Sequence, residues 1–168
     1  SEREPEQGGN LMLVKKWFEE NEPEVEITTF INTKTVDRLK KKELRDCAFK
    51  CATSVVIILE DFYPQLHSIQ KRSETKIVQL WHACGAFKTF GLTRMGKQGG
   101  APQTSMNHRN YDLVPVSSDT VRDIYAEAFG ISSSKVQALG VPRTDVLFDW
   151  EYEEKKREEL YEKYPAFK

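Results

Sequence analysis

The sequence lacks the features that would place the protein across a membrane or on nucleic acid. No apolar run approaches the roughly 18 residues that a membrane-spanning helix needs. The opening stretch SEREPEQGGN is polar throughout, unlike a secretory signal. The 168 residues carry a formal net charge of -1, so no basic excess is present to attract nucleic acid. We therefore expect no nucleic-acid partner.

Motifs for cofactors and metals are also missing. Neither a G-x-G-x-x-G fingerprint nor a Walker-type phosphate loop occurs, and no cluster has the spacing of metal ligands. The three cysteines are Cys47, Cys51 and Cys84. Cys47 and Cys51 lie four residues apart, on one face of a predicted helix, which favours core packing over metal binding. The sequence predicts no cofactor, no metal and a reduced, cytosolic chain.

What the sequence does contain is an alternation of helical and strand patterns. Apolar residues make up 39% of a chain long enough for one domain with a sizeable core. Helical spacing occurs in residues 10–20, 35–51, 118–129 and 151–164, and strand-like runs occur in residues 25–31, 54–59, 76–81, 113–116 and 136–139. Continuous apolar runs such as 54–59 indicate strands covered on both faces. The alternation predicts a parallel α/β sheet.

Three elements carry more specific expectations. Pro115 interrupts its strand, which indicates an edge strand or an irregular end. The helix over 118–129 begins at a Ser118 or Asp119 cap and stops at Gly130. Its expected buried stripe is Val121, Ile124, Tyr125, Ala128 and Phe129. The helix over 151–164 is charged and has few apolar positions, so it needs a partner surface or stays marginal alone.

The run VQLWHACGAFKTFG places a histidine at the end of a predicted strand. In open parallel sheets, ligands bind at the carboxyl ends of the strands, where His82 would lie. The small residues after His82 leave room for a substrate. Glu60 and Asp61 end the preceding strand at the same edge, where an acid could orient a base or a hydroxyl, or cap a helix or loop. His82 itself is either a catalytic or a structural residue.

Residues 85–110 form a long glycine-rich segment with four cations, namely Lys88, Arg94, Lys97 and Arg109. Such a segment is either functional, with cations that suit phosphate groups, or a solvated surface loop. His108, beside Arg109, is a candidate for phosphate contact or for ordering the loop. His67 lies in a predicted surface segment and is not expected to have a function.

Four motifs together resemble the CDP-glycerol glycerophosphotransferase family of teichoic acid synthesis: QLWHACGAFKTFG, NHRNYD, VSSDTVRDIYAEAFGI and LGVPRTDVLFD. The resemblance covers about residues 55–149. It implies that residues 1–150 form a Rossmann-like, acceptor-side domain, which is the N-terminal half of a glycosyltransferase B-type fold. In that fold, the first strand of the domain would precede Ser1. Residues 151–168 would lead to a C-terminal, donor-binding domain outside this chain.

The resemblance also implies a reaction. Family members transfer glycerol phosphate from CDP-glycerol to a hydroxyl of a lipid-linked acceptor or growing chain, and CMP leaves. The resemblance makes His82 the base. From its position at the neighbouring strand end, Asp61 is our candidate for the acid that orients it. From charge and position, we expect acceptor phosphates to contact Lys88, Arg94, Lys97, His108, Arg109 and Arg143. The expected location is cytoplasmic, with peripheral association at the inner face of the cell membrane, and this chain alone should be inactive.

One departure from the family pattern leaves the substrate open. Many relatives have W-H-G, a small residue and proline, and then two lysines. Here the run is WHACGAFKTFG, with the glycine at Gly85 and only Lys88 in the basic position. The alternatives are transfer of ribitol phosphate or a sugar by the same fold, or a module that binds an anionic polymer without chemistry.

Overall fold

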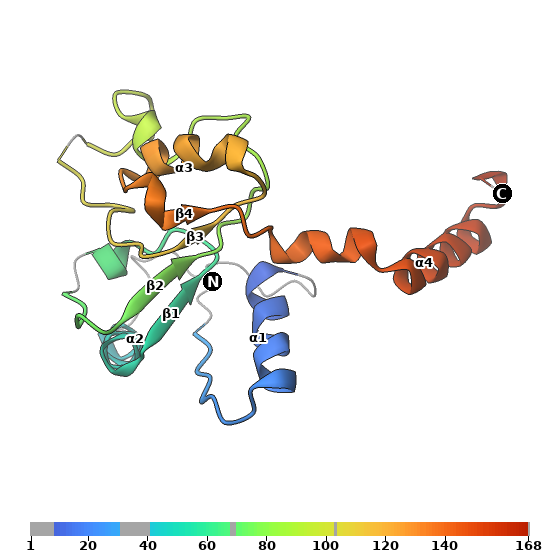
Figure 1. Ribbon diagram of the computed structural model, residues 1–168, viewed down its shortest axis with the longest axis horizontal. Helices are drawn as coiled ribbons and strands as arrows, with labels where there is room; N and C mark the ends of the chain where they lie inside the picture. Colours follow the sequence, from blue (N-terminus) through green and yellow to red (C-terminus); the bar gives the residue numbers. More distant parts are fainter. Residues whose placement is uncertain (1–8, 31–40, 68–69, 103, 168) are drawn as a thin grey trace.

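The computed structural model describes residues 9–30, 41–67, 70–102 and 104–167 (Figure 1). Its elements in chain order are α1 (Asn10–Asn21), α2 (Lys41–Thr53), β1 (Val56–Leu59), β2 (Lys76–Gln79), β3 (Val114–Pro115), α3 (Arg122–Phe129), β4 (Val136–Gln137) and α4 (Trp150–Lys163). Short 3-10 turns lie between them, including Gly91–Arg94, Asp119–Val121 and Pro142–Phe148. Elements of the predicted types occur at all the predicted positions within these ranges except residues 25–30.

The strands form a parallel arrangement, as predicted. β1 pairs with β2 in parallel, from Val56 opposite Lys76 to Leu59 opposite Gln79. β3 pairs with β4 in the same sense, and a parallel bridge between Val78 and Leu113 joins the two pairs. β3 therefore lies between β2 and β4, so the expectation of an edge strand at Pro115 is wrong. The alternative, an irregular end, agrees with the two-residue length of β3, since proline has no N–H for a ladder bond.

The core lies between β2, β3, β4 and α3. Its fully buried side chains include Tyr111, Val114, Phe129 and Val136, and Trp81 packs edge-on against Phe129. In α3, Tyr125, Ala128 and Phe129 are buried as predicted, but Ile124 is 44% exposed and Ala126 takes a buried position instead. The predicted stripe is wrong at Ile124 because the buried face of α3 runs through Tyr125, Ala126, Ala128 and Phe129, and Ile124 lies outside that face.

The predicted strand over 25–31 is wrong in its described part, because residues 25–30 form no strand. Its β-branched residues favour a strand, but a strand needs a neighbour to receive its backbone hydrogen bonds. A groove of about 740 Å³ is lined by this segment together with α1, α2 and β1. The expectation that residues 54–59 are covered on both faces is also wrong, since Val55 and Val56 are exposed beside this groove.

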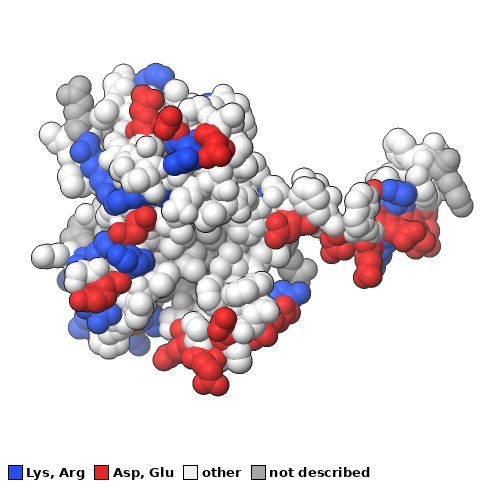
Figure 2. Space-filling model, viewed as in Figure 1, with Lys and Arg blue, Asp and Glu red and all other residues white. Residues whose placement is uncertain are grey.

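α4 projects away from the body of the domain (Figure 1). None of its residues is buried, and acidic side chains crowd its surface in the space-filling view (Figure 2). The prediction of a charged helix is confirmed. The N-terminal part of the second predicted helix, residues 35–40, lies outside the described residues, as does Ile31. Of the cysteines, Cys47 is buried, Cys51 is half-buried and Cys84 is exposed.

Candidate active site

His82 lies just past the carboxyl end of β2, where the chain leaves the sheet. The last ladder bond runs from the Leu80 N–H to the Leu59 carbonyl at 2.7 Å. Trp81 then takes a left-handed backbone conformation with φ 57°, and the His82 ring stacks on the Trp81 indole at 4.4 Å between centroids. The His82 side chain is 26% exposed. The imidazole is therefore supported on one side and reachable by solvent.

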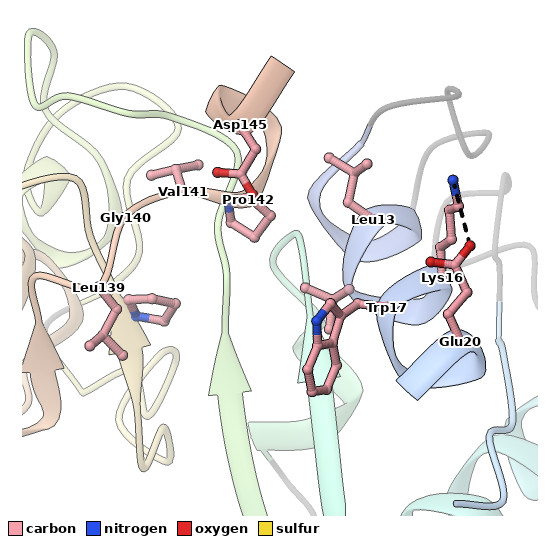
Figure 3. A pocket seen from close by; sticks show the side chains of 11 residues that line it. Leu13, Lys16, Trp17, Glu20, Leu139, Gly140, Val141, Pro142 and Asp145 are labelled. Atoms are coloured by element: carbon pink, nitrogen blue, oxygen red, sulfur yellow. Dashed lines mark ion pairs between the residues drawn. The ribbon is translucent and has the colours of Figure 1, made fainter. Parts of the chain in front are cut away.

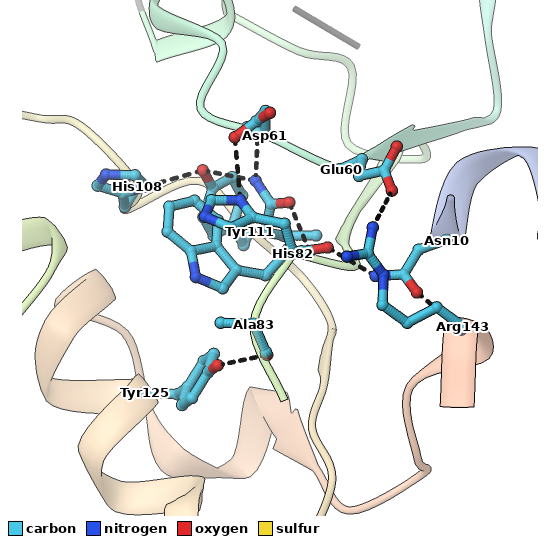
Figure 4. A network of polar contacts seen from close by, with 11 residues as sticks. Asn10, Glu60, Asp61, His82, Ala83, His108, Tyr111, Tyr125 and Arg143 are labelled. Atoms are coloured by element: carbon cyan, nitrogen blue, oxygen red, sulfur yellow. Dashed lines mark hydrogen bonds and ion pairs between the residues drawn. The ribbon is translucent and has the colours of Figure 1, made fainter. Parts of the chain in front are cut away.

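Asp61 meets His82 at this edge (Figure 4). Nδ1 of His82 lies 3.0 Å from Oδ1 of Asp61, whose side chain is 12% exposed. Nδ1 is buried and the contact does not meet the geometry of a hydrogen bond, so the carboxylate is the close neighbour of this nitrogen. The pair forms because β1 and β2 are adjacent parallel strands, whose carboxyl ends lie side by side. An acid facing Nδ1 favours the tautomer with its proton there and leaves Nε2 as an acceptor.

Gln79 connects the two chain segments that carry this pair. Its buried Nε2 donates to the Asp61 carbonyl and to the Tyr111 hydroxyl, both at 3.0 Å. Its Oε1 accepts the Trp81 N–H at 3.0 Å. The sequence analysis missed Gln79, although a polar residue inside the apolar run 77–81 was a usable signal.

Asn10, the first residue of α1, connects a third segment to the site. Its buried Nδ2 donates to the Trp81 carbonyl, and its Oδ1 accepts the Arg143 N–H, each at 2.9 Å. The Arg143 guanidinium lies beside Glu60, with Nη2 3.3 Å from Oε1. Arg143 is thus the predicted cation that the structure brings to the neighbourhood of His82. Nothing in the sequence marked Asn10, since an asparagine at a helix start is an ordinary residue there.

His108 and His67 lie together beneath this network. The His108 N–H donates to Nδ1 of His67 at 3.2 Å, and His108 Nδ1 lies 2.9 Å from the Tyr111 hydroxyl. His108 is buried, and burial lowers its pKa to about 4; burial also lowers the pKa of His67. Of the two expected roles of His108, these surroundings favour ordering the loop. The expected surface position of His67 is wrong, because its ring is half-buried against Phe62.

The segment after His82 is packed onto α3. The Tyr125 hydroxyl donates to the carbonyls of Ala83 and Gly85 at 2.8 and 3.3 Å, and burial raises the pKa of Tyr125 to about 12. A Cβ on Gly91 would lie 2.2 Å from the Ala128 carbonyl oxygen. Gly85 and Gly91 are therefore in contact with α3, whereas Phe87 and Lys88 between them are exposed, so both alternatives for this segment stay open.

The other four predicted cations lie on the surface of the long glycine-rich segment. Lys88, Arg94, Lys97 and Arg109 are all exposed. Arg94 donates from Nη2 to the Gln98 carbonyl at 2.8 Å, within its own loop. Across the described part of the chain, no hydrogen bond or ion pair joins any of the four to His82. Their role in phosphate contact stays a prediction.

A separate cavity of about 450 Å³ lies between α1 and the segment after β4 (Figure 3). Trp17 and Leu13 line it on one side, and Leu139 and Pro142 on the other. None of the residues predicted for phosphate contact is among its lining residues. Within residues 9–30, 41–67, 70–102 and 104–167, no group of three or more His, Cys, Asp or Glu side chains is placed to hold a metal ion. No helix in these ranges has the length and apolarity to cross a bilayer.

A parallel sheet with its polar residues at the carboxyl edge defines an α/β domain of the Rossmann-like class. The solved wall teichoic acid polymerase TagF shares this fold, with a TM-score of 0.60 over 89% of this chain and 39% of that chain, at 13% identity. The expected glycosyltransferase B-type fold is thereby confirmed. The chain belongs to the CDP-glycerol:poly(glycerophosphate) glycerophosphotransferase family, whose model matches residues 1–167.

Curated relatives include polymerases and primases. The chain is 42% identical to a teichoic acid poly(ribitol-phosphate) polymerase of Bacillus spizizenii, over 95% of this chain and 26% of that protein. It is 46% identical to the teichoic acid ribitol-phosphate polymerase TarL of Staphylococcus aureus, over 67% of this chain and 20% of that protein. It is 32% identical to a teichoic acid glycerol-phosphate primase of Bacillus subtilis, over 56% of this chain and 26% of that protein. The chain thus spans about a quarter of the length of such relatives.

Proposed function

We propose that the natural polypeptide containing these residues transfers a polyol phosphate from a CDP-activated polyol to a hydroxyl of a teichoic acid acceptor. The observation that carries this proposal is the contact between His82 and Asp61, in a family of such transferases. The pair lies where ligands of open parallel sheets bind, and its imidazole is accessible.

In this proposal His82 is the general base. Nε2 takes the proton of the acceptor hydroxyl while the hydroxyl oxygen attacks the phosphorus that carries the polyol. The bond from that phosphorus to the bridging oxygen breaks, and CMP leaves with the electron pair. A positioned base contributes about 10²–10⁴-fold. Positioning and charge neutralisation contribute the rest, as in other phosphoryl transfers.

The predicted cations would hold the phosphates of the acceptor chain. Arg143 is the best placed, because its backbone is fixed by Asn10 and its side chain lies beside Glu60. Lys88, Arg94, Lys97 and Arg109 would contact phosphates further along the polymer. His108 is left out of this group, since a buried, neutral imidazole is a poor partner for an anion.

Ribitol phosphate is the polyol that we favour over the glycerol phosphate expected from the family resemblance. The ribitol-phosphate polymerases named above are 42% and 46% identical to this chain, against 32% for the glycerol-phosphate primase. Donor contacts would lie mainly in a second domain reached through α4. This chain alone is then inactive, and any membrane association is peripheral and cytoplasmic, at the lipid-linked acceptor. Liposome co-sedimentation tests the last point.

The test is CMP release by the natural polypeptide with a teichoic acid acceptor and CDP-ribitol, CDP-glycerol or a nucleotide sugar. We expect His82→Gln to lower kcat by about 10²–10⁴-fold while the KM for the acceptor changes little. His67→Gln is the matched control, because it changes a histidine away from the predicted proton transfer. Full turnover by His82→Gln would refute the base. Polymer binding without turnover of any donor by the unaltered protein would favour the binding module.

A further inference from the structure

The backbone just before His82 is strained and is held by side chains. Trp81 has φ 57°, a left-handed conformation that costs an L-residue about 1–2 kcal/mol. Its backbone hydrogen bonds go to side chains: the N–H donates to Gln79 Oε1, and the carbonyl accepts from Asn10 Nδ2. Residues in such conformations persist when their surroundings fix them, and they gather at functional sites.

Gln79 also holds the other side of the pair. The amide that binds the Trp81 N–H donates from Nε2 to the Asp61 carbonyl at 3.0 Å. A single buried side chain therefore contacts the backbone next to the base and the backbone of its acid. Asp61 and Trp81 are 20 positions apart in the chain, so local sequence does not set their spacing.

The orientation of this amide is determined by its partners. Oε1 faces an N–H donor, while Nε2 faces the Asp61 carbonyl, which can only accept, and the Tyr111 hydroxyl. Exchanging the two ends would place an amide N–H against the Trp81 N–H and an oxygen against the Asp61 carbonyl oxygen. Both donor hydrogens and the oxygen are engaged, so the buried group is satisfied in one orientation.

We propose that Gln79 is a positioning residue that sets the spacing of His82 Nδ1 and Asp61 Oδ1, with Asn10 securing the far side of the Trp81 peptide. This inference rests on the proposed function of His82 as the base. Without the Gln79 amide, the Trp81 peptide relaxes toward negative φ and turns the His82 ring away from Asp61. Nδ1 then loses the acid that keeps the proton on it, and Nε2 is no longer held as the acceptor.

The test compares Gln79→Met with Gln137→Met in the natural polypeptide. Methionine keeps the approximate shape of Gln79 but none of its polar contacts. Gln137 is a matched control because it also lies in a strand but its side chain is exposed. We expect Gln79→Met to lower kcat by about 10²-fold, the effect of a misplacement near 1 Å, with the donor KM within about twofold. Gln137→Met should change neither constant.

A second readout separates positioning from a purely structural role. The ¹⁵N shifts of the His82 ring, assigned with His82→Gln, report which ring nitrogen carries the proton. We expect a single Nδ1–H tautomer in the unaltered protein and in Gln137→Met, and a mixture in Gln79→Met. If Gln79→Met does not fold, Gln79→Asn serves instead, since it keeps the amide but is one methylene too short to reach both partners.

The two proposals fail in different ways. A folded Gln79 variant with unchanged kcat and an unchanged tautomer overturns the positioning role, even where His82→Gln is inactive. If His82→Gln retains full turnover, the base is refuted, and the positioning role in catalysis falls with it. The tautomer measurement then shows only whether Gln79 orients the ring.

Discussion

Asn10 accepts a hydrogen bond at 2.9 Å from the backbone N–H of Arg143, a residue 133 positions later in the chain. The same amide donates to the Trp81 carbonyl. Three segments far apart in the sequence are therefore held at one edge of the sheet. The resemblance carried by the sequence motifs covers only about residues 55–149, yet the helix α1 before that range is part of the framework of the site.

Asn10→Ala should destabilise the protein. It removes both hydrogen bonds and leaves the Trp81 carbonyl and the Arg143 N–H without these partners, at about 1–3 kcal/mol. Asn21→Ala, at the other end of α1, is the control, because the hydrogen bond that the Asn21 side chain donates to the Trp17 carbonyl is exposed to solvent. Its effect should stay within about 0.5 kcal/mol. Urea unfolding measures both, and equal losses would contradict a specific role for Asn10.

The position of the candidate base was predictable because it depends only on local pattern. An apolar run ending in a histidine, next to a run ending in an acid, brings both to one sheet edge once the strands are parallel. Asn10 and Gln79 were not predictable in the same way. Their partners lie in other segments, and only tertiary packing shows which backbone groups a buried amide meets.

Other differences have physical causes of the same kind. The β-branched run over 25–30 has strand propensity but pairs with none of the strands in the described residues, and propensity alone does not supply hydrogen bonds. Ile124 had the right spacing for a buried stripe, but the buried face of α3 includes Ala126 on its other side, and Ile124 lies outside that face. The exposed cations of residues 88–109 could be counted in the sequence, whereas their distance from His82 depends on how the loop folds.

Gly91→Ala should destabilise the protein more than Gly96→Ala. Both glycines have positive φ, 55° and 75°, so both substitutions incur the backbone cost, about 1–2 kcal/mol. Only at Gly91 would the new Cβ meet backbone, 2.2 Å from the Ala128 oxygen, while nothing lies within 4 Å at Gly96. The difference in Tm between the two variants measures the cost of the steric contact with Ala128, because both variants have the same backbone cost. Equal shifts in Tm would show that the loop does not rest on α3.

α4 should be the least protected helix in hydrogen exchange. None of its residues is buried, and it is charged along its length. The Asp149 side chain caps its first turn by accepting the Tyr152 N–H at 3.0 Å, but a cap alone does not make an isolated helix stable. Exchange measured by mass spectrometry on the 168 residues should be faster in α4 than in β1. Slower exchange in α4 would mean that it already has a partner surface.

The protein should lose stability as the pH falls through the range where buried histidines titrate. Burial lowers the pKa of His108 from its usual 6.5 to about 4 in the folded protein, and the pKa of His67 shifts in the same direction. Between these values the unfolded chain binds more protons than the folded one. The stabilisation from keeping His108 neutral is therefore complete above pH 6.5 and declines toward pH 4, by about 2 kcal/mol between pH 6.5 and 5.

His108→Asn isolates this contribution. Asparagine tolerates the positive φ of 67° at this position but does not titrate. The variant also loses the contact with the Tyr111 hydroxyl, so it should be less stable than the unaltered protein at pH 7. The free energy of unfolding that the variant loses between pH 7 and 5 should be smaller than in the unaltered protein, because one buried imidazole is gone. Urea midpoints at the two pH values measure the difference. If both proteins lost the same free energy, His108 would not be the group that titrates, and His67 or carboxylates would account for the acid sensitivity.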